Sequence, residues 1–104
     1  MKTYELHEEA LADIEETLHY FIAEFKSAQT AKDFKLELDA TFKLLADMPY
    51  IGRKRSYRNP KYREVRVFPV KNFKNYDIFY KPKKNGVFIL RVMYARRDIK
   101  SLLS

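Results

Sequence analysis

The side chains of this sequence that are able to do chemistry are mostly cations, and tyrosines lie between them. Residues 50–66 read YIGRKRSYRNPKYREVR, and a cationic pair follows the most apolar stretch of the chain. Arginine makes bidentate contacts with phosphates and carboxylates, and tyrosine offers a ring face to a base or to a protein. We therefore expect a macromolecular target, such as a nucleic acid, to be bound by Arg53, Lys54, Arg55, Arg58, Lys61, Arg63, Arg66, Arg96 and Arg97.

Several residues in and near this stretch also have a structural interpretation. Arg97 and Asp98 are adjacent and form a possible structural pair at the start of a terminal helix. Pro49 and Gly52 are expected to shape a turn, with Gly52 supplying a backbone conformation that other residues avoid. Packing on the edge of a sheet is an equal alternative for the tyrosines of this stretch, Tyr50, Tyr57 and Tyr62.

Charge is distributed unevenly along the 104 residues, whose formal net charge is +7. Residues 1–48 carry five Lys or Arg against eleven Asp or Glu, a net charge of −6. Residues 49–104 carry sixteen against three, a net charge of +13. A basic half of this strength attracts polyanions or an acidic partner protein. The alternative is that these cations are solvated strand ends and loops.

Length and composition exclude several classes of protein. With 104 residues, 46% of them hydrophobic, the chain fits one globular domain over residues 1–104. It has no cysteine and only two histidines, so we expect no disulfide scaffold, metal site or cofactor. No apolar run reaches the roughly 18 residues of a membrane span, and the first residues lack the core of a secretion signal. We expect a cytoplasmic protein without membrane association.

Apolar periodicity predicts a strand and two helices in the acidic half. Residues 3–6 alternate as a short strand, and from Glu8 to Phe25 apolar residues recur at steps of three and four. A break over residues 26–29 precedes a second amphipathic stretch, for which Thr30 is the expected N-cap. Pro49 marks the end of this second helix. A link this short predicts an antiparallel helical hairpin.

The basic half predicts three strands. Residues 64–68 alternate, and Pro69 indicates an edge position or a bulge. Residues 76–80 form the next strand, and Asn85-Gly86 predicts a hairpin turn into the apolar run 87–95, the expected central strand. Residues 48–61 are expected to be irregular, and Asp98 to cap a short last helix. The order β-α-α-β-β-β-(α) predicts an α+β fold: a mainly antiparallel sheet with the N-terminal helical hairpin packed on one face.

Five features in this order resemble the RelE/ParE superfamily of bacterial type II toxins, and its ParE branch in particular. They are the β-α-α start, PYIGR at 49–53, YDIFY at 76–80, ILRV at 89–92, and ARRD at 95–98 before a double-leucine tail. The resemblance covers essentially the whole chain. It implies a growth-arresting toxin of the plasmid-stabilisation type, neutralised by a cognate and often acidic antitoxin, with no small-molecule substrate.

The resemblance leaves two activities to compare, because the RelE branch cleaves mRNA on the ribosome and the ParE branch is associated with poisoning of DNA gyrase. Metal-independent cleavage needs a base, an acid and cations around the phosphate. RelE-like enzymes place an arginine where this chain has Asp77, and residues 99–104 contain no Tyr or His. His7 and His19, in the acidic half, are not expected to be catalytic. A nuclease here would use Glu64 as its base, with Arg63, Arg66, Arg96 and Arg97.

We therefore expect a ParE-like toxin that is not itself an enzyme and whose target is DNA gyrase. A ribosome-dependent mRNA endoribonuclease is the alternative, and an inert member of the family is a third possibility. A sheet covered by helices on one side leaves a face or an edge on which an acidic and apolar antitoxin segment can add a strand or lay a helix. The aromatic residues expected to contact the antitoxin are Phe79, Phe88 and Tyr94.

Overall fold

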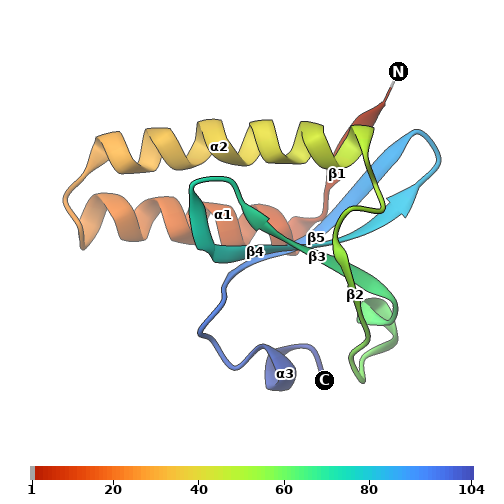
Figure 1. Ribbon diagram of the computed structural model, residues 1–104. Coiled ribbons are helices and arrows are strands. Elements are labelled where there is room, and N and C mark those ends of the chain that lie inside the picture. The colour runs from red at the N-terminus through yellow and green to blue at the C-terminus, as the bar shows by residue number, and fades with distance from the viewer. Residues whose placement is uncertain (1) are drawn as a thin grey trace.

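The structure is a computed structural model that describes residues 2–104, and its element order confirms the predicted α+β fold (Figure 1). Within these residues, no helix has the length and apolar character that crossing a bilayer requires. The elements are β1 (Thr3–Leu6), α1 (Glu8–Ala23), α2 (Ala28–Asp47), β2 (Arg53–Arg55), a 3-10 turn (Pro60–Tyr62), β3 (Val65–Val70), β4 (Phe73–Lys83), β5 (Gly86–Tyr94) and α3 (Ile99–Leu102).

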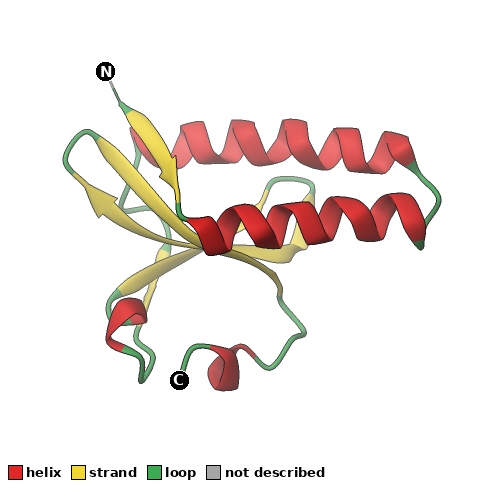
Figure 2. Cartoon of the chain, turned by 180° about the vertical axis from the view of Figure 1, so that it is seen from behind, coloured by secondary structure: helices red, strands yellow, loops and turns green. Residues whose placement is uncertain are grey.

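The five strands form one sheet in the order β1-β5-β4-β3-β2, with β1 parallel to β5 and the other pairs antiparallel (Figure 2). We expected the run 87–95 to be central; β5 is an interior strand, but β4 is in the middle because β2 adds a strand beyond β3. The expected hairpin turn is confirmed, with positive φ angles of 62° at Asn85 and 150° at Gly86. We expected an edge position or a bulge at Pro69; β3 is paired on both sides, and its register with β4 is irregular between Pro69 and Val70.

The two long helices lie side by side on one face of the sheet, as the periodicity predicted (Figure 1). The N-cap of α2 is Ser27 and not the expected Thr30, because the Ser27 hydroxyl accepts a 3.0 Å hydrogen bond from the Thr30 backbone N–H. Apolar side chains from both helices and from the sheet fill the space between the two layers: Ile14, Phe21, Phe34, Leu38, Phe42, Ile78, Tyr80, Ile89 and Val92.

The sheet face turned away from the hairpin carries a second, smaller core. Two residues from distant segments cover it: Tyr62 from the turn before β3 and Leu103 from the C-terminal tail, both buried. The tail is held there by a 3.2 Å hydrogen bond from the Asn59 N–H to the Leu103 carbonyl. We expected this face to be a possible partner surface, but it is covered over the strand residues Val65, Val67, Phe79, Leu90 and Met93.

A buried ion pair fastens α1 to the sheet. The Arg91 guanidinium donates two hydrogen bonds to Asp13, from Nε to Oδ2 at 2.7 Å and from Nη2 to Oδ1 at 2.9 Å. Asp13 Oδ2 also accepts the Val92 backbone N–H at 3.0 Å. The Asp13 side chain is 8% exposed and the Arg91 side chain 14% exposed. This hydrogen-bonded pairing raises the pKa of Arg91 above its usual range, so the guanidinium stays charged at every physiological pH.

A β-bulge aims the arginine at its partner. Phe79 of β4 pairs with Arg91 and Tyr80 pairs with Ile89, so Leu90 has no opposite residue. The bulge shifts the alternation of β5: Ile89 and Val92, three residues apart, both enter the core under the helices. Because β1 ends at the level of Ile89, no strand separates Arg91 from α1.

Removing one partner of this pair is expected to destabilise the protein. Asp13→Asn leaves a largely buried guanidinium without its carboxylate, which costs about 3 kcal/mol of unfolding free energy. We take the lower end of the usual range because Glu9 Oε2 lies 3.7 Å from Arg91 Nη1 and offers a partial substitute. Urea denaturation measures the loss.

The matched control is Glu16→Gln, an exposed carboxylate on the same helix, which is expected to change the unfolding free energy by less than about 0.5 kcal/mol. A loss below about 1 kcal/mol in Asp13→Asn would show that the pair contributes little to stability.

Candidate functional site

The edge of the sheet at β2 is entirely cationic. Its three residues, Arg53, Lys54 and Arg55, are all exposed, and β2 pairs on one side only, with β3. Three consecutive cations carry no apolar alternation, so the sequence predicted an irregular segment here. The strand forms because β3 offers it backbone hydrogen-bond partners. Charge on an edge strand also discourages pairing with another sheet.

The nine cations expected to bind a target divide into two groups in the structure. Three are engaged within the chain: Lys54 is 3.3 Å from Glu64, Lys61 pairs with Glu9, and Arg66 binds backbone carbonyls. Within residues 2–104, no acidic side chain lies within ion-pair distance of the other six, which are exposed: Arg53, Arg55, Arg58, Arg63, Arg96 and Arg97.

Lys61 ties the loop before β3 to the start of α1. Its ammonium donates to Glu9 Oε1, which also accepts the Tyr62 hydroxyl at 3.3 Å. The hydrogen bond from Lys61 lowers the pKa of Glu9, and the same bond raises the pKa of Lys61. Lys61 therefore helps to position the cationic loop that contains it.

Two of the exposed arginines lie close to a carboxylate in the middle of the sheet. Asp77 of β4 is half-buried, and its desolvation raises its pKa while Arg53 and Arg55 act in the opposite direction. Asp77 pairs with Met93 of β5, three residues before Arg96. The charges of Arg53 and Arg55 thus act on Asp77 from the far side of β3, and the arginine pair follows β5 on the other side of β4.

Glu64, the expected general base of a nuclease, is exposed and paired with Lys54. Its backbone has a positive φ of 56°, and its N–H donates to the Ser56 hydroxyl at 3.0 Å. The Glu64 carboxylate, just before β3, therefore forms an ion pair with the neighbouring strand β2.

The turn at Pro49–Gly52 is held by two buried or half-buried side chains. The Tyr80 hydroxyl donates to the Pro49 carbonyl at 2.8 Å and accepts the Gly52 N–H at 2.9 Å. Arg66 Nη1 donates to the carbonyls of Tyr50 at 3.1 Å and Gly52 at 2.9 Å. We expected Gly52 to supply an unusual backbone angle; instead it leaves room, since a Cβ there would lie 2.5 Å from the Tyr80 hydroxyl.

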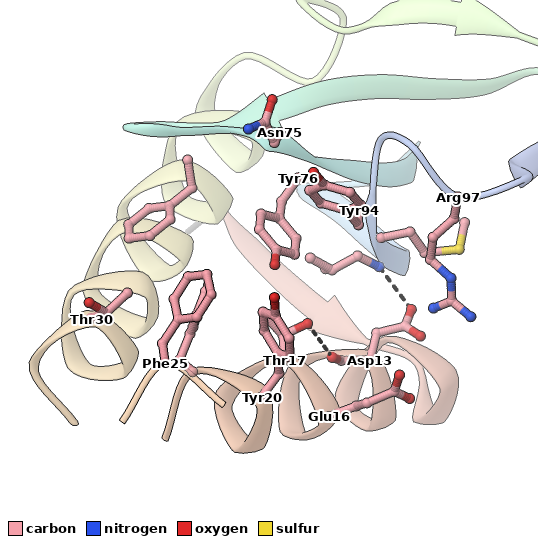
Figure 3. Close-up of a pocket in the computed structure, with 14 residues that line it drawn as sticks. Asp13, Glu16, Thr17, Tyr20, Phe25, Thr30, Asn75, Tyr76, Tyr94 and Arg97 are labelled. Atoms are coloured by element: carbon pink, nitrogen blue, oxygen red, sulfur yellow. Dashed lines mark hydrogen bonds between the residues drawn. The ribbon is translucent and has the colours of Figure 1, made fainter. Parts of the chain in front are cut away.

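A groove of about 600 Å³ separates the second half of α1 from β4 and β5 (Figure 3). Tyr20 and Phe25 approach it from the helical side, and Tyr76 and Tyr94 from the strands. The rings of Tyr76 and Tyr94 are 5.3 Å apart, and desolvation raises the pKa of Tyr76. Arg97, which follows β5, also lines the groove and lies at its rim in Figure 3. The groove combines aromatic walls with a cation at its mouth.

The three residues expected to contact an antitoxin lie in two different places. Phe79 is buried in the second core beneath Tyr57, with ring centroids 6.2 Å apart. Phe88 packs against the same core and is half-buried. Tyr94 lines the groove. Sequence reasoning missed the other groove residues, because the groove forms between α1 and the strands β4 and β5, which are far from it along the chain.

Comparisons with known proteins show where this fold occurs. The family model "ParE toxin of type II toxin-antitoxin system, parDE" matches residues 4–99. The chain belongs to the ParE toxin family. A search of curated proteins gives no match. Among solved structures, the "Chromosomal ParDE TA system from P. aeruginosa" has a similar fold, with a TM-score of 0.68 and 18% identity over 92% of this chain and 98% of that one.

For this ParE-family toxin, the close approach at Gly52 gives a direct test of the turn. Gly52→Ala places a methyl group against the fully buried Tyr80 ring, and we expect a loss of about 1–3 kcal/mol of unfolding free energy. Thermal unfolding measures it, with Arg55→Ala, an exposed neighbour, as the control. If Gly52→Ala raises the stability, as glycine replacement does where the backbone and space permit, the packing argument is wrong.

Proposed function

We propose that this ParE-family toxin arrests growth by binding DNA gyrase through the cationic surface of β2 and of the segments that flank it. The observation that carries the proposal is the set of six exposed cations that have no acidic side chain within ion-pair distance in residues 2–104. A surface of this kind raises the rate of encounter with a polyanionic assembly such as gyrase on DNA. Gyrase as a target places the toxin in the cytoplasm.

The alternative, mRNA cleavage, has weaker support from the geometry. The Asp77 carboxylate, whose pKa is affected by the charges of Arg53 and Arg55, would repel a phosphate bound near those arginines. Glu64 is held in an ion pair with Lys54, and the last six residues contain no aromatic acid or base. We therefore favour binding without catalysis.

The direct test adds purified toxin to gyrase and plasmid DNA. We expect the plasmid to accumulate as cleaved or unsupercoiled DNA as the toxin concentration rises. Normal supercoiling at a large excess of toxin would contradict the proposal. In that case mapping mRNA 5′ ends after induction decides the alternative, because only the endoribonuclease leaves codon-linked cuts.

The arginine pair after β5 is expected to be needed for toxicity. Arg96 and Arg97 are exposed, so Arg96→Ala combined with Arg97→Ala should abolish growth arrest while changing the unfolding free energy by less than about 0.5 kcal/mol. Lys32→Ala combined with Lys35→Ala removes the same charge from an exposed part of α2 and is the control. Loss of folding in the arginine variant would show that the pair is structural.

We further propose that the groove holds a segment of the cognate antitoxin. Its aromatic walls suit the apolar face of an amphipathic segment, and Arg97 at the rim suits an acidic residue of that segment. Because Arg97 is also one of the cations assigned to the target, a segment seated in the groove would mask part of the toxic surface. This overlap gives neutralisation a physical cause.

Phe25 tests the groove without touching the cationic surface. Its side chain is largely exposed at the groove wall and stacks on Tyr20 with ring centroids 5.1 Å apart. Phe25→Ser is expected to weaken antitoxin binding at least about tenfold, as loss of an aromatic anchor does, and to leave growth arrest intact. Calorimetric titration with the antitoxin measures this, with Leu36→Ser as the control. Unchanged affinity would place the antitoxin elsewhere.

A further inference from the structure

The turn between α2 and β2 presents an unusual apolar surface, which we call the Tyr50 platform: Leu44, Met48, Tyr50 and Ile51. Tyr50 is 69% exposed, more than any other large hydrophobic side chain in residues 2–104. Met48 is 51% exposed, one helical turn after the exposed Leu44. The four residues are close along the chain, and the Ile51 N–H donates to the Met48 carbonyl at 3.3 Å. Clustered exposure of this kind marks an interaction site.

The backbone of the turn that carries Tyr50 is held by hydrogen bonds with two side chains of the sheet. Tyr80, which is fully buried, binds the backbone at Pro49 and Gly52 on either side of the exposed tyrosine. Arg66 binds the Tyr50 carbonyl, and the side chain of Tyr50 extends from this fixed backbone. A partner that binds here loses little loop entropy, which is the advantage of a preorganised contact surface.

One face of the Tyr50 ring is already occupied. The Arg66 Cζ lies 5.0 Å from the ring centroid in a cation–π contact. The neighbouring exposed side chains, Met48 and Ile51, are aliphatic and flexible. This combination is suited to filling an apolar pocket on a protein and is less suited to stacking on a series of nucleic-acid bases.

The charges around the platform define its partner. Lys54 and Arg66 are cross-strand neighbours, and Arg53 is next to Gly52 at the end of the turn. The acidic groups nearby are Glu64, which Lys54 neutralises, and the exposed Asp47 at the end of α2. Basic groups therefore dominate the side of the platform that adjoins β2. Electrostatic complementarity then favours a partner with acidic residues at this position.

We propose that the Tyr50 platform is the anchor with which the toxin docks on its target protein, entering an apolar pocket bordered by acidic side chains. The inference rests on the proposed function, since it adds a protein contact to the cationic surface that was assigned to the target. The platform continues directly into β2, and its Tyr50 ring contacts Arg66, one of the nine cations expected to bind the target. It shares no residue with the groove proposed for the antitoxin.

The test compares Tyr50→Ser with Leu36→Ser, which removes another large hydrophobic side chain of similar exposure, 63% against 69%. Leu36 is on α2, twelve residues before Met48 and so about 18 Å from it along the helix. We expect Tyr50→Ser to require at least about tenfold more toxin for half-maximal growth arrest, and Leu36→Ser to behave as the wild type. Both melting temperatures should stay within about 2 °C of the wild type.

The same three proteins are then titrated against gyrase holoenzyme, antitoxin and plasmid DNA. Parallel loss of growth arrest and gyrase binding in Tyr50→Ser, with antitoxin and DNA binding unchanged, supports the platform as a target anchor. If the wild type does not bind gyrase, the proposed target is wrong, and loss of growth arrest in Tyr50→Ser still supports a protein anchor. The inference is overturned if Tyr50→Ser arrests growth as well as Leu36→Ser does. It is also overturned if Tyr50→Ser loses only its binding to DNA, its binding to the antitoxin or its self-association.

Discussion

The arrangement of both functional surfaces depends on one carboxylate. Asp13 accepts three hydrogen bonds, two from Arg91 and one from the Val92 backbone, and so fixes α1 against the part of β5 that β1 does not reach. The pair sets the separation between the helix and the strand ends, which is the width of the aromatic groove. Glu9, one helical turn earlier, binds Lys61 and so connects the same helix to the cationic loop. A buried pair adds little net stability compared with apolar packing, and its value here is that it sets a geometry.

The two surfaces differ in the physics of what they can bind. The groove has aromatic walls and a single cation at its rim, which suits an amphipathic segment. The β2 edge and the Tyr50 platform combine exposed cations with an aromatic side chain on a hydrogen-bonded turn, which suits a large acidic assembly. Arg97 is the one residue that we assign to both surfaces. An antitoxin segment in the groove would therefore cover part of the surface proposed to bind the target. In this proposal, target and antitoxin therefore exclude one another at Arg97 without a long-range conformational change.

Much of the fold could be predicted from local patterns, and the remainder depends on contacts between distant segments. Helical periodicity and the Asn85-Gly86 turn are local properties, and the structure confirms them. Strand β2 was missed because only its pairing with β3 makes three consecutive cations extended. The second core joins the turn at Tyr62 to Leu103 across forty residues, which no periodicity reveals. Gly52 was correctly identified as part of the turn, but the reason, the nearby Tyr80 hydroxyl, lies on another strand.

The central claim is that target and antitoxin occupy different but adjoining surfaces of one rigid domain. Amide hydrogen exchange of the toxin, measured alone, with gyrase and with antitoxin, tests it most directly. With gyrase, slower exchange is expected at residues 50–58 and 95–97; with antitoxin, it is expected along the second half of α1 and the end of β5. Protection by gyrase confined to the outer side of the helical hairpin, with residues 50–58 unchanged, would contradict the account.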